Sequence, residues 1–421
     1  MNQKVAKSKV VVVGLGYVGL PLAMAACDIG LEVVGIDIDQ RKVDLLKAGV
    51  SYVEDIDDET LQAHLSAGSF LSSTDYGLVK NFDVAVITVP TPLTNGLPDL
   101  SFIEDAANAL SPFLSEGSTV ILESTTYPGT TEELLIPALE LNSNLKGGED
   151  FFVGYSPERI DPGNKKWTLI STPKVTSGVN AESLKRVNEF YESLGIQTVP
   201  VKGTREAELT KLLENTFRHV NIALVNELCV FANQIDVDVW EAIRAAESKP
   251  FGFMKFLPGP GVGGHCLPVD PSYLSWAIKQ KTGSTFQFVE LANSINRNMP
   301  RYVIERAARL IPELPLSKAK ALLVGLSYKP NTGDVRESPA LDIARLLIEE
   351  GTQVFGLDEH VNLNLWPSGI IKVDEETDEV FDIILILNIH DGVNLSKLIN
   401  SKVPVLDTRN SIGHADHIET L

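Results

Sequence analysis

The sequence predicts an α/β protein with two doubly wound parallel sheets, joined by a central helical domain that contains one long helix. Short apolar runs alternate with helix-like segments in the N-terminal part and again near the C-terminus, as in parallel sheets covered by helices. Between them, residues 204–234 contain neither Gly nor Pro, which is typical of a long helix. We therefore expect domains at 1–203, 204–312 and 313–421.

The N-terminal strands are predicted from short runs of apolar, often β-branched residues. Residues 9–14 (KVVVVG) have the composition of a strand that is buried on both faces. A glycine-rich turn follows, then a helical stretch over 18–28 and a second strand over 32–37. Further strands are expected at 84–89 and 119–122, each followed by a turn and a helix-like segment.

The central part is predicted to be helical from the long helix to about Pro312. A second α/β pattern starts at Lys318. Its strand-like runs are KALLVGLSYK, TQVFGLD, DIILILN and VPVLDTR, and SPALDIARLLIEEG is the helix-like segment between the first two. Both ends of the chain thus share a strand–glycine–helix order, which predicts two sheets of the same type.

The composition favours a globular protein with a small-molecule substrate. In 421 residues, 44% are hydrophobic and 22% are charged, which are ordinary values for a globular chain. Lys and Arg number 36 against 56 Asp and Glu, a formal net charge of −20. This balance argues against nucleic acid or an anionic membrane surface as the principal partner. A small anionic substrate needs only a local basic cluster.

Cysteine usage and the N-terminus indicate a reducing, cytoplasmic setting. Cys27, Cys229 and Cys266 are too widely spaced for a disulfide framework or a zinc site, so we expect no metal. The uncharged run over 10–27 follows several lysines and resembles an export signal, but glycines and a proline interrupt it. A strand–turn–helix unit explains those glycines better, so we expect neither export nor membrane insertion.

A glycine fingerprint predicts a dinucleotide cofactor. Gly14, Gly16 and Gly19 form G-x-G-x-x-G between a strand and a helix, where Rossmann-like domains bind a pyrophosphate at the helix N-terminus. Asp37 ends the second strand 18 residues after Gly19, the position of an acid that binds the ribose hydroxyls of NAD. NAD is favoured over NADP, although Arg41 nearby leaves NADP open. The expected cofactor-binding residues are Gly14, Gly16, Tyr17, Val18, Gly19, Asp37, Arg41, Pro90, Thr91 and Thr126.

Three polar residues are expected on one face of the long helix. Lys211, Asn215 and Arg218 stand at i, i+4 and i+7, so they project on the same side. A solvated stripe of an amphipathic helix would have the same spacing. Alternatively, a Lys and an Asn one turn apart can polarise a substrate oxygen and stabilise an oxyanion.

Residues 258–270 (PGPGVGGHCLPVD) form a loop that predicts either a buried thiol or a nucleophile. Its glycines, among them Gly263, allow positive φ and a close approach of the backbone to a ligand. Asp270 follows Cys266 by four residues, and a thiol beside an ionisable group is a candidate for covalent catalysis. Most free cysteines, however, are small buried hydrophobic residues. The loop by itself leaves both interpretations open.

Polar loops follow several predicted strands at the edge where ligands bind in open α/β sheets. They are Pro90-Thr91, residues 123–126 (ESTT) and residues 155–159 (YSPER). Each of these segments by itself is also compatible with an ordinary connecting loop that has no functional role.

Six blocks in this chain resemble the UDP-glucose/GDP-mannose dehydrogenase family, the nucleotide-sugar 6-dehydrogenases. In order they are GLGYVGLP, ESTTYPGTTEE, YSPERIDPGN, TKLLENTFRHVNIALVNE, KPFGFMKFLPGPGVGGHCLPVDP and GLSYKPNTGDVRESPA. The loop before Cys266 is similar to that of the branch acting on UDP-N-acetylhexosamines, UDP-N-acetyl-D-glucosamine above all. The resemblance implies an N-terminal NAD-binding Rossmann domain, a central dimerisation domain and a C-terminal UDP-sugar-binding domain.

The resemblance also implies a reaction, two successive NAD-dependent oxidations of the sugar C6 alcohol to a carboxylate, with roles for individual residues. Cys266 would capture the aldehyde as a thiohemiacetal, which is then oxidised to a thioester. Lys211 and Asn215 would stabilise the oxyanion, and Asp270 would assist proton transfers. Thr126 would position the water of the first step, and Glu158 would serve in thioester hydrolysis.

The resemblance implies a UDP-sugar as partner and a homodimer or higher homo-oligomer as the assembly. The substrate-binding residues would be Glu158, Arg159, Lys211, Asn215, Arg218, Lys255, Gly263, Lys329 and Arg409. Lys255, where relatives more often have Pro, and Pro330, in place of a second Lys, depart from the family pattern. The alternatives are UDP-N-acetylmannosamine, UDP-N-acetylgalactosamine or UDP-glucose as substrate, a two-electron dehydrogenase of the 3-hydroxyacid type, and a non-enzymatic NAD-sensing protein.

Overall fold

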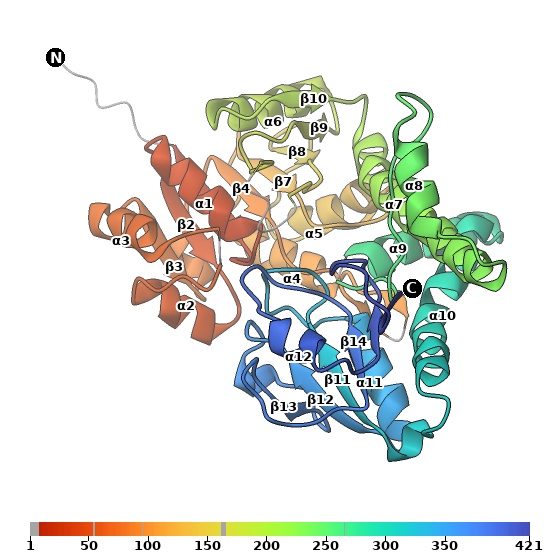
Figure 1. Ribbon diagram of the computed structural model, residues 1–421. Coiled ribbons are helices and arrows are strands. Elements are labelled where there is room, and N and C mark those ends of the chain that lie inside the picture. Colours follow the sequence, from red (N-terminus) through yellow and green to blue (C-terminus); the bar gives the residue numbers. More distant parts are fainter. Residues whose placement is uncertain (1–7, 54, 95, 161–165, 265) are drawn as a thin grey trace. The chain divides into compact units, whose positions relative to one another are not determined.

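The computed structural model describes residues 8–53, 55–94, 96–160, 166–264 and 266–421. The chain forms two compact units that divide between Glu214 and Asn215 (Figure 1). Helix α7 (Thr204–Gln234) contains this boundary, so the chain passes from the first unit to the second within a helix. The predicted long helix is therefore confirmed. The domain limits at 203 and 312 stay predictions.

The first unit is built on a sheet with the strand order β10-β9-β8-β7-β4-β1-β2-β3. Its main strands are β1 (Lys9–Val13), β2 (Glu32–Ile36), β3 (Phe70–Ser73), β4 (Val84–Ile87), β7 (Thr119–Leu122), β8 (Phe152–Tyr155), β9 (Lys174–Gly178) and β10 (Thr198–Pro200). The six strands β3, β2, β1, β4, β7 and β8, in this spatial order, pair in parallel and are doubly wound, as predicted. Strand β9 runs antiparallel to β8. The order reverses between β1 and β4, where open α/β sheets bind ligands.

Both faces of this sheet are covered, which explains why its strands are continuously apolar. Val10 and Val12 pack into a core with residues of the helices α1, α3 and α6, while Val11 and Val13 are buried on the opposite side. The helices are α1 (Gly19–Asp28), α2 (Gln40–Lys47), α3 (Asp58–Ala67), α4 (Ser101–Leu110), α5 (Ile136–Glu140) and α6 (Ala181–Ser193). A short hairpin, β5 (Leu93–Thr94) and β6 (Leu97–Pro98), follows β4.

The second unit joins a helical part to a parallel sheet of order β13-β12-β11-β14-β15-β16. Its strands are β11 (Lys320–Val324), β12 (Gln353–Leu357), β13 (Ile371–Lys372), β14 (Ile383–Ile386), β15 (Val405–Asp407) and β16 (Ile418–Thr420). Besides most of α7, its helices are α8 (Val239–Glu247), α9 (Cys266–Thr282), α10 (Gln287–Leu310), α11 (Pro339–Glu349) and α12 (Ser396–Asn400). Here the order reverses between β11 and β14, so this edge is the second place for a ligand.

The second sheet is also covered on both faces. Ala321 and Leu323 belong to a core with residues of α7, α8, α10 and α11, whereas Leu322 and Val324 belong to a separate core with Phe355 and the α12 region. The predicted class, two doubly wound sheets and a helical part with one long helix, is confirmed.

Candidate active site

The glycine loop after β1 has the geometry that a pyrophosphate site requires. Gly14 has φ +94°, and a Cβ there would lie 2.8 Å from the carbonyl oxygen of Thr88. A Cβ at Gly19 would lie 1.8 Å from the carbonyl oxygen of Gly14, so only glycine permits this helix to start so close to the strand. A Cβ at Gly16 would meet no atom within 4 Å. That open side leaves room for the phosphates at the start of α1.

Asp37 is held at the end of β2 by the backbone around it. Its Oδ2 accepts the N–H of Leu15 at 2.9 Å and its Oδ1 accepts the N–H of Asp39 at 2.9 Å. Nζ of Lys42 lies 3.5 Å from Oδ2 as a third donor, and a carboxylate has about four lone-pair sites, so acceptor capacity remains for at least one ribose hydroxyl. Arg41 was the residue that kept NADP as an alternative cofactor. Its guanidinium forms a forked contact with the carboxylate of Asp39, with Nη2 2.9 Å from Oδ2.

The other expected cofactor residues lie on the same edge of the sheet. Pro90 and Thr91 follow β4, which pairs with β1 directly beside the glycine loop, and Thr91 is buried. Tyr17 and Val18 lie in that loop, immediately before α1. Thr126 follows β7 but is fully buried, and its hydroxyl donates to Thr130. This contact assigns Thr126 to the packing of its loop, and a part in water positioning stays a prediction.

The carboxylate of Glu158 belongs to a buried charged cluster that the sequence did not reveal. Its Oε1 accepts the N–H groups of Arg159 and Ile160, each at 2.6 Å, and its Oε2 lies 2.8 Å from Nζ of Lys174. The same ammonium lies 3.2 Å from Oε1 of Glu123. Glu123 also accepts a hydrogen bond from the hydroxyl of Tyr191, and both residues are buried. Glu158 is thus anchored through both carboxylate oxygens.

The cluster distributes its charge unequally between the two acids. Burial raises the pKa of Glu123 to about 7, although Lys174 opposes the shift. Burial also acts to raise the pKa of Glu158, but Lys174 and the N–H of Ile160 outweigh it, so that pKa is lowered. Glu158 is therefore the ionised member near neutral pH. A role for it as a base in thioester hydrolysis requires that it leave Lys174, and this role stays a prediction.

The side chain of Lys211 on α7 forms a hydrogen bond with the backbone of Glu158. Its Nζ donates to the carbonyl oxygen of Glu158 at 2.6 Å, which fixes the ammonium beside the loop that follows β8. Arg159 of the same loop turns to α7 as well, with Nη2 2.7 Å from Glu214 and Nη1 2.6 Å from the carbonyl oxygen of Pro173. The two cations that were predicted to bind substrate thus already have partners that hold them in place.

In the second unit, the structure brings together two of the predicted catalytic side chains. Asn215, one turn after Lys211 on α7, donates its amide to the carboxylate of Asp270, and both residues are buried. Asp270 lies four residues after Cys266, which begins α9. The thiol of Cys266 is outside the described part of the structure. Arg218 is exposed on α7.

The two other cysteines are unsuitable as nucleophiles. Both are buried. Burial raises the pKa of Cys27 to about 12 and that of Cys229 to about 11, so both thiols stay protonated at neutral pH. Cys266 is the remaining candidate.

The glycines before Cys266 pack closely against residues of the C-terminal sheet edge. A Cβ at Gly259 would lie 2.5 Å from Nη1 of Arg409, and a Cβ at Gly263 would lie 2.8 Å from Cβ of Tyr328. Tyr328 would obstruct a side chain at Gly264 too, where φ is +81°. These glycines therefore admit residues of the C-terminal sheet edge. The expectation that they also let the backbone approach a ligand stays a prediction.

The predicted UDP-binding cations divide into two groups. Lys329 follows β11 and Arg409 follows β15, at the edge of the sheet where the strand order reverses. Arg409 donates from Nε to the carbonyl oxygen of Leu387 at 3.2 Å; burial lowers its pKa, but a guanidinium stays charged at neutral pH. Lys255 instead forms an ion pair of 2.7 Å with Glu247.

Models of known protein families match nearly the whole chain. The NAD binding domain of the UDP-glucose/GDP-mannose dehydrogenase family matches residues 8–195, its central domain 205–298, and its UDP binding domain 322–414. The chain belongs to this family. It is an NAD-dependent oxidoreductase, with the cofactor bound by the first domain and UDP by the last.

Individual relatives of this dehydrogenase differ in the sugar that their names give. A UDP-N-acetyl-D-glucosamine 6-dehydrogenase of Pseudomonas aeruginosa is 38% identical over 91% of this chain and 90% of its own. A UDP-N-acetyl-D-mannosamine dehydrogenase of Methanococcus maripaludis is 32% identical over 96% and 93%. The structure of a UDP-D-ManNAc dehydrogenase from Pyrococcus horikoshii has a TM-score of 0.88, with 32% identity over 98% of both chains.

The described residues contain neither a cluster of metal ligands nor a membrane-spanning helix. No three His, Cys, Asp or Glu side chains among them are grouped as metal ligands. Within the same residues, no helix has both the length and the apolar character needed to cross a membrane.

Proposed function

We propose that this dehydrogenase oxidises the C6 alcohol of a UDP-N-acetylhexosamine, first of all UDP-N-acetyl-D-glucosamine, to the carboxylate in a four-electron reaction. The observation that carries the proposal is the Asn215–Asp270 hydrogen bond beside the start of α9, where Cys266 stands. A buried amide and a carboxylate four residues after a cysteine suit the capture of an aldehyde, which a two-electron dehydrogenase does not need.

The proposed reaction balances as one alcohol, two NAD⁺ and one water giving one carboxylate, two NADH and three protons. NAD supplies the hydride acceptor for each of the two oxidations. After the first, the thiolate of Cys266 adds to the aldehyde carbon, and the carbonyl electron pair becomes an oxyanion. Lys211 and Asn215 would stabilise this oxyanion before hydride loss leaves a thioester, which water then cleaves.

Asp270 is suited to proton transfer in this scheme. It is 1% exposed, so it acts in a dry environment, and the amide of Asn215 orients it. Glu158 would assist the hydrolysis, and Thr126 would position the water of the first step. For the hydrolysis, Glu158 would have to leave Lys174, whereas Thr126 would act from its present contact with Thr130.

The UDP part would be bound at the edge of the C-terminal sheet. Lys329 and Arg409 come from the loops that follow β11 and β15, and a diphosphate favours such a pair of cations on an otherwise acidic protein. Arg159, Arg218, Lys255 and Gly263 complete the proposed substrate contacts. The product, a UDP-linked uronic acid, would serve the synthesis of surface polysaccharides in the cytoplasm.

This proposal predicts two NADH per molecule of UDP-N-acetyl-D-glucosamine, because a captured aldehyde is oxidised before release. The measurement is absorbance at complete conversion of a limiting amount of the sugar nucleotide, with identification of the product by mass. The same assay on the manno and galacto epimers compares kcat/KM, which we expect to be highest for the gluco sugar. One NADH with a free aldehyde would contradict the four-electron reaction. A higher kcat/KM for another epimer would correct the sugar alone.

We also propose that the protein forms a homodimer through α7. Phe217, Leu224, Leu228 and Phe231 are 46%, 53%, 48% and 55% exposed, and their spacing puts them on one side of the helix. Large apolar side chains in a row of this kind usually mark an interface between proteins.

Replacing both Leu224 and Leu228 by Glu should shift the protein from dimer to monomer, because charges would then be buried at the interface. Light scattering during size-exclusion chromatography measures the mass. Glu227→Gln, a change at a neighbouring exposed position, serves as the control. A double variant that keeps the dimer mass would place the interface elsewhere.

A further inference from the structure

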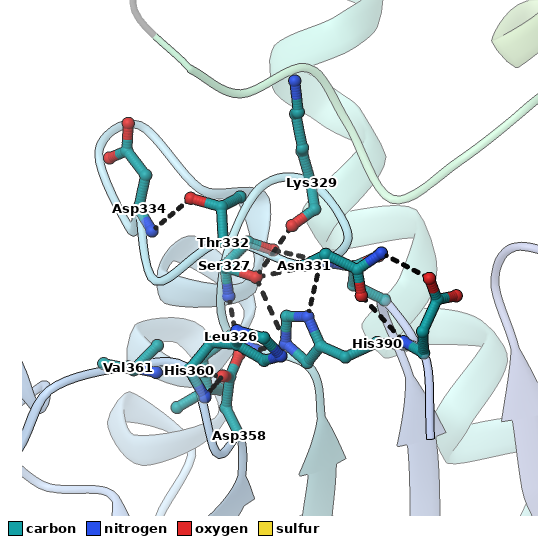
Figure 2. Close-up of polar contacts among 12 residues, drawn as sticks. Leu326, Ser327, Lys329, Asn331, Thr332, Asp334, Asp358, His360, Val361 and His390 are labelled. Carbon is teal, nitrogen blue, oxygen red and sulfur yellow. Dashed lines mark hydrogen bonds and ion pairs between the residues drawn. The ribbon is translucent and has the colours of Figure 1, made fainter. Parts of the chain in front are cut away.

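Asp358, directly after β12, is the C-terminal counterpart of Asp37. Its Oδ2 accepts the N–H groups of Leu326 and Ser327 at 2.8 and 3.1 Å, and its Oδ1 accepts those of His360 and Val361 at 3.0 and 3.1 Å (Figure 2). The side chain is 1% exposed. Sequence reasoning singled out Asp37 but not this residue, because the loop before it lacks the G-x-G-x-x-G spacing.

Unlike Asp37, Asp358 has no acceptor capacity left for a ribose. A fifth donor, Nε2 of His390, lies 3.1 Å from its Oδ2, and a carboxylate has about four lone-pair sites. The carboxylate therefore serves the protein itself. It joins the loop after β11, the loop after β12 and, through His390, the loop after β14.

The contacts of His390 define its tautomer. The backbone N–H of Asn331 donates to Nδ1 at 2.8 Å, so Nδ1 carries a lone pair. The ring proton is then on Nε2, which donates to Asp358. The ring is 3% exposed and stacks on His360, with centroids 4.3 Å apart. His390 thus bridges a buried carboxylate and one backbone N–H in a single orientation.

That backbone N–H lies two residues after Lys329. On the other side of Lys329, the hydroxyl of Ser327 donates to the carbonyl oxygen of Lys329 at 3.1 Å. Asn331 has φ +59°, and its side chain makes two hydrogen bonds of 2.8 Å to Asp391, the neighbour of His390: Nδ2 donates to the carboxylate, and Oδ1 accepts the backbone N–H. The main chain is therefore held on both sides of Lys329, while its side chain points away from the His390 ring (Figure 2).

We propose that His390 is a positioning residue of the UDP site: as the Nε2–H tautomer it accepts the N–H of Asn331 at Nδ1 and so fixes where the Lys329 ammonium meets the diphosphate. This inference rests on the proposed contact of Lys329 with UDP. The specific bond that acts is the one between Nδ1 and Asn331, since Asp358 keeps four backbone donors without His390.

Two substitutions of His390 distinguish the contribution of Nδ1 from that of Nε2. His390→Asn retains an acceptor near the position of Nδ1, whereas His390→Gln retains a donor near the position of Nε2 but leaves the N–H of Asn331 without its acceptor. UDP itself is the probe, titrated calorimetrically into the full-length protein, with NAD titrated as the control. We expect His390→Gln to weaken UDP about tenfold and His390→Asn less than about threefold, with NAD affinity unchanged in both.

A double-substitution cycle tests whether His390 acts through Lys329. In a Lys329→Met background, His390→Gln should weaken UDP by no more than about twofold further, because the lysine it positions is gone. In turnover, His390→Gln should raise KM for the UDP-sugar more than it lowers kcat. Additive effects in the cycle, or equal UDP affinities of the Asn and Gln variants, would overturn the inference.

The outcomes also distinguish this inference from the function on which it rests. If Lys329→Met binds UDP as the unchanged protein does, the proposed Lys329 contact fails and the His390 proposal with it. If Lys329→Met is weak and His390→Gln is not, only the His390 proposal fails. Should the Gln variant not fold, the ¹⁵N shifts of labelled histidines in the unchanged protein decide, since a ring protonated on Nδ1 would overturn the proposal.

Discussion

Replacing Cys266 by Ala is expected to lower the rate of carboxylate formation by about 10³-fold or more, because no thioester can then form. NAD binding should persist, since the glycine loop and Asp37 belong to the first unit. The measurement is the rate of uronic acid production by mass spectrometry, together with calorimetric titration of NAD. A variant that releases aldehyde with one NADH would place the loss after the first oxidation, as the proposal requires.

Cys229→Ala provides the matched control for this experiment. Cys229 is buried in the core of the second unit, and its raised pKa keeps it a thiol. Its loss should lower stability while leaving the ratio of carboxylate to NADH unchanged. If Cys266→Ala forms carboxylate at the original rate, Cys266 is not the nucleophile.

Replacing Lys211 by Met is expected to lower kcat by about 10²- to 10³-fold, the usual effect of removing one donor to an oxyanion. Met has nearly the same length, so the loss should come from the ammonium, which also donates to the carbonyl oxygen of Glu158. The measurements are kcat and KM for the UDP-sugar under saturating NAD.

Lys211→Arg and Lys185→Met serve as controls for Lys211→Met. Arginine keeps the charge but changes the donor geometry, so partial activity is expected. Lys185 is an exposed lysine on α6, and its replacement should leave kcat unchanged. A Lys211→Met enzyme in which only KM rises would assign the residue to substrate binding, and its role with the oxyanion would be wrong.

Much of the site could be predicted from local patterns. The glycine fingerprint was predicted because its spacing is a local pattern: a side chain at Gly19 would meet Gly14, five residues earlier. Gly14 also has to clear Thr88, a contact that only the fold supplies. The helix spacing likewise predicted that Lys211 and Asn215 stand one turn apart, because the period of a helix depends on no other part of the chain.

Contacts between distant segments could not be predicted in this way. Lys174 forms ion pairs with Glu123 and Glu158, and the three residues lie at the ends of three different strands. The sequence around each of them does not predict an ion pair. His390 and Asp358 are another such pair, 32 residues apart on neighbouring loops. The close packing of the glycines at 259 and 263 against Arg409 and Tyr328 could not be predicted, because these neighbours are remote in the sequence.

The sequence by itself determined the two doubly wound sheets, the long helix, the NAD fingerprint and the membership of a dehydrogenase family. The first three follow from periodicity and short-range sterics, which act within a few residues, whereas the family membership follows from the resemblance of six sequence blocks. Only the tertiary structure decided which buried charges neutralise each other and which loop carries Lys329 in a fixed place. Buried polar groups must find partners wherever the fold brings them, and the fold rather than the sequence spacing sets those distances.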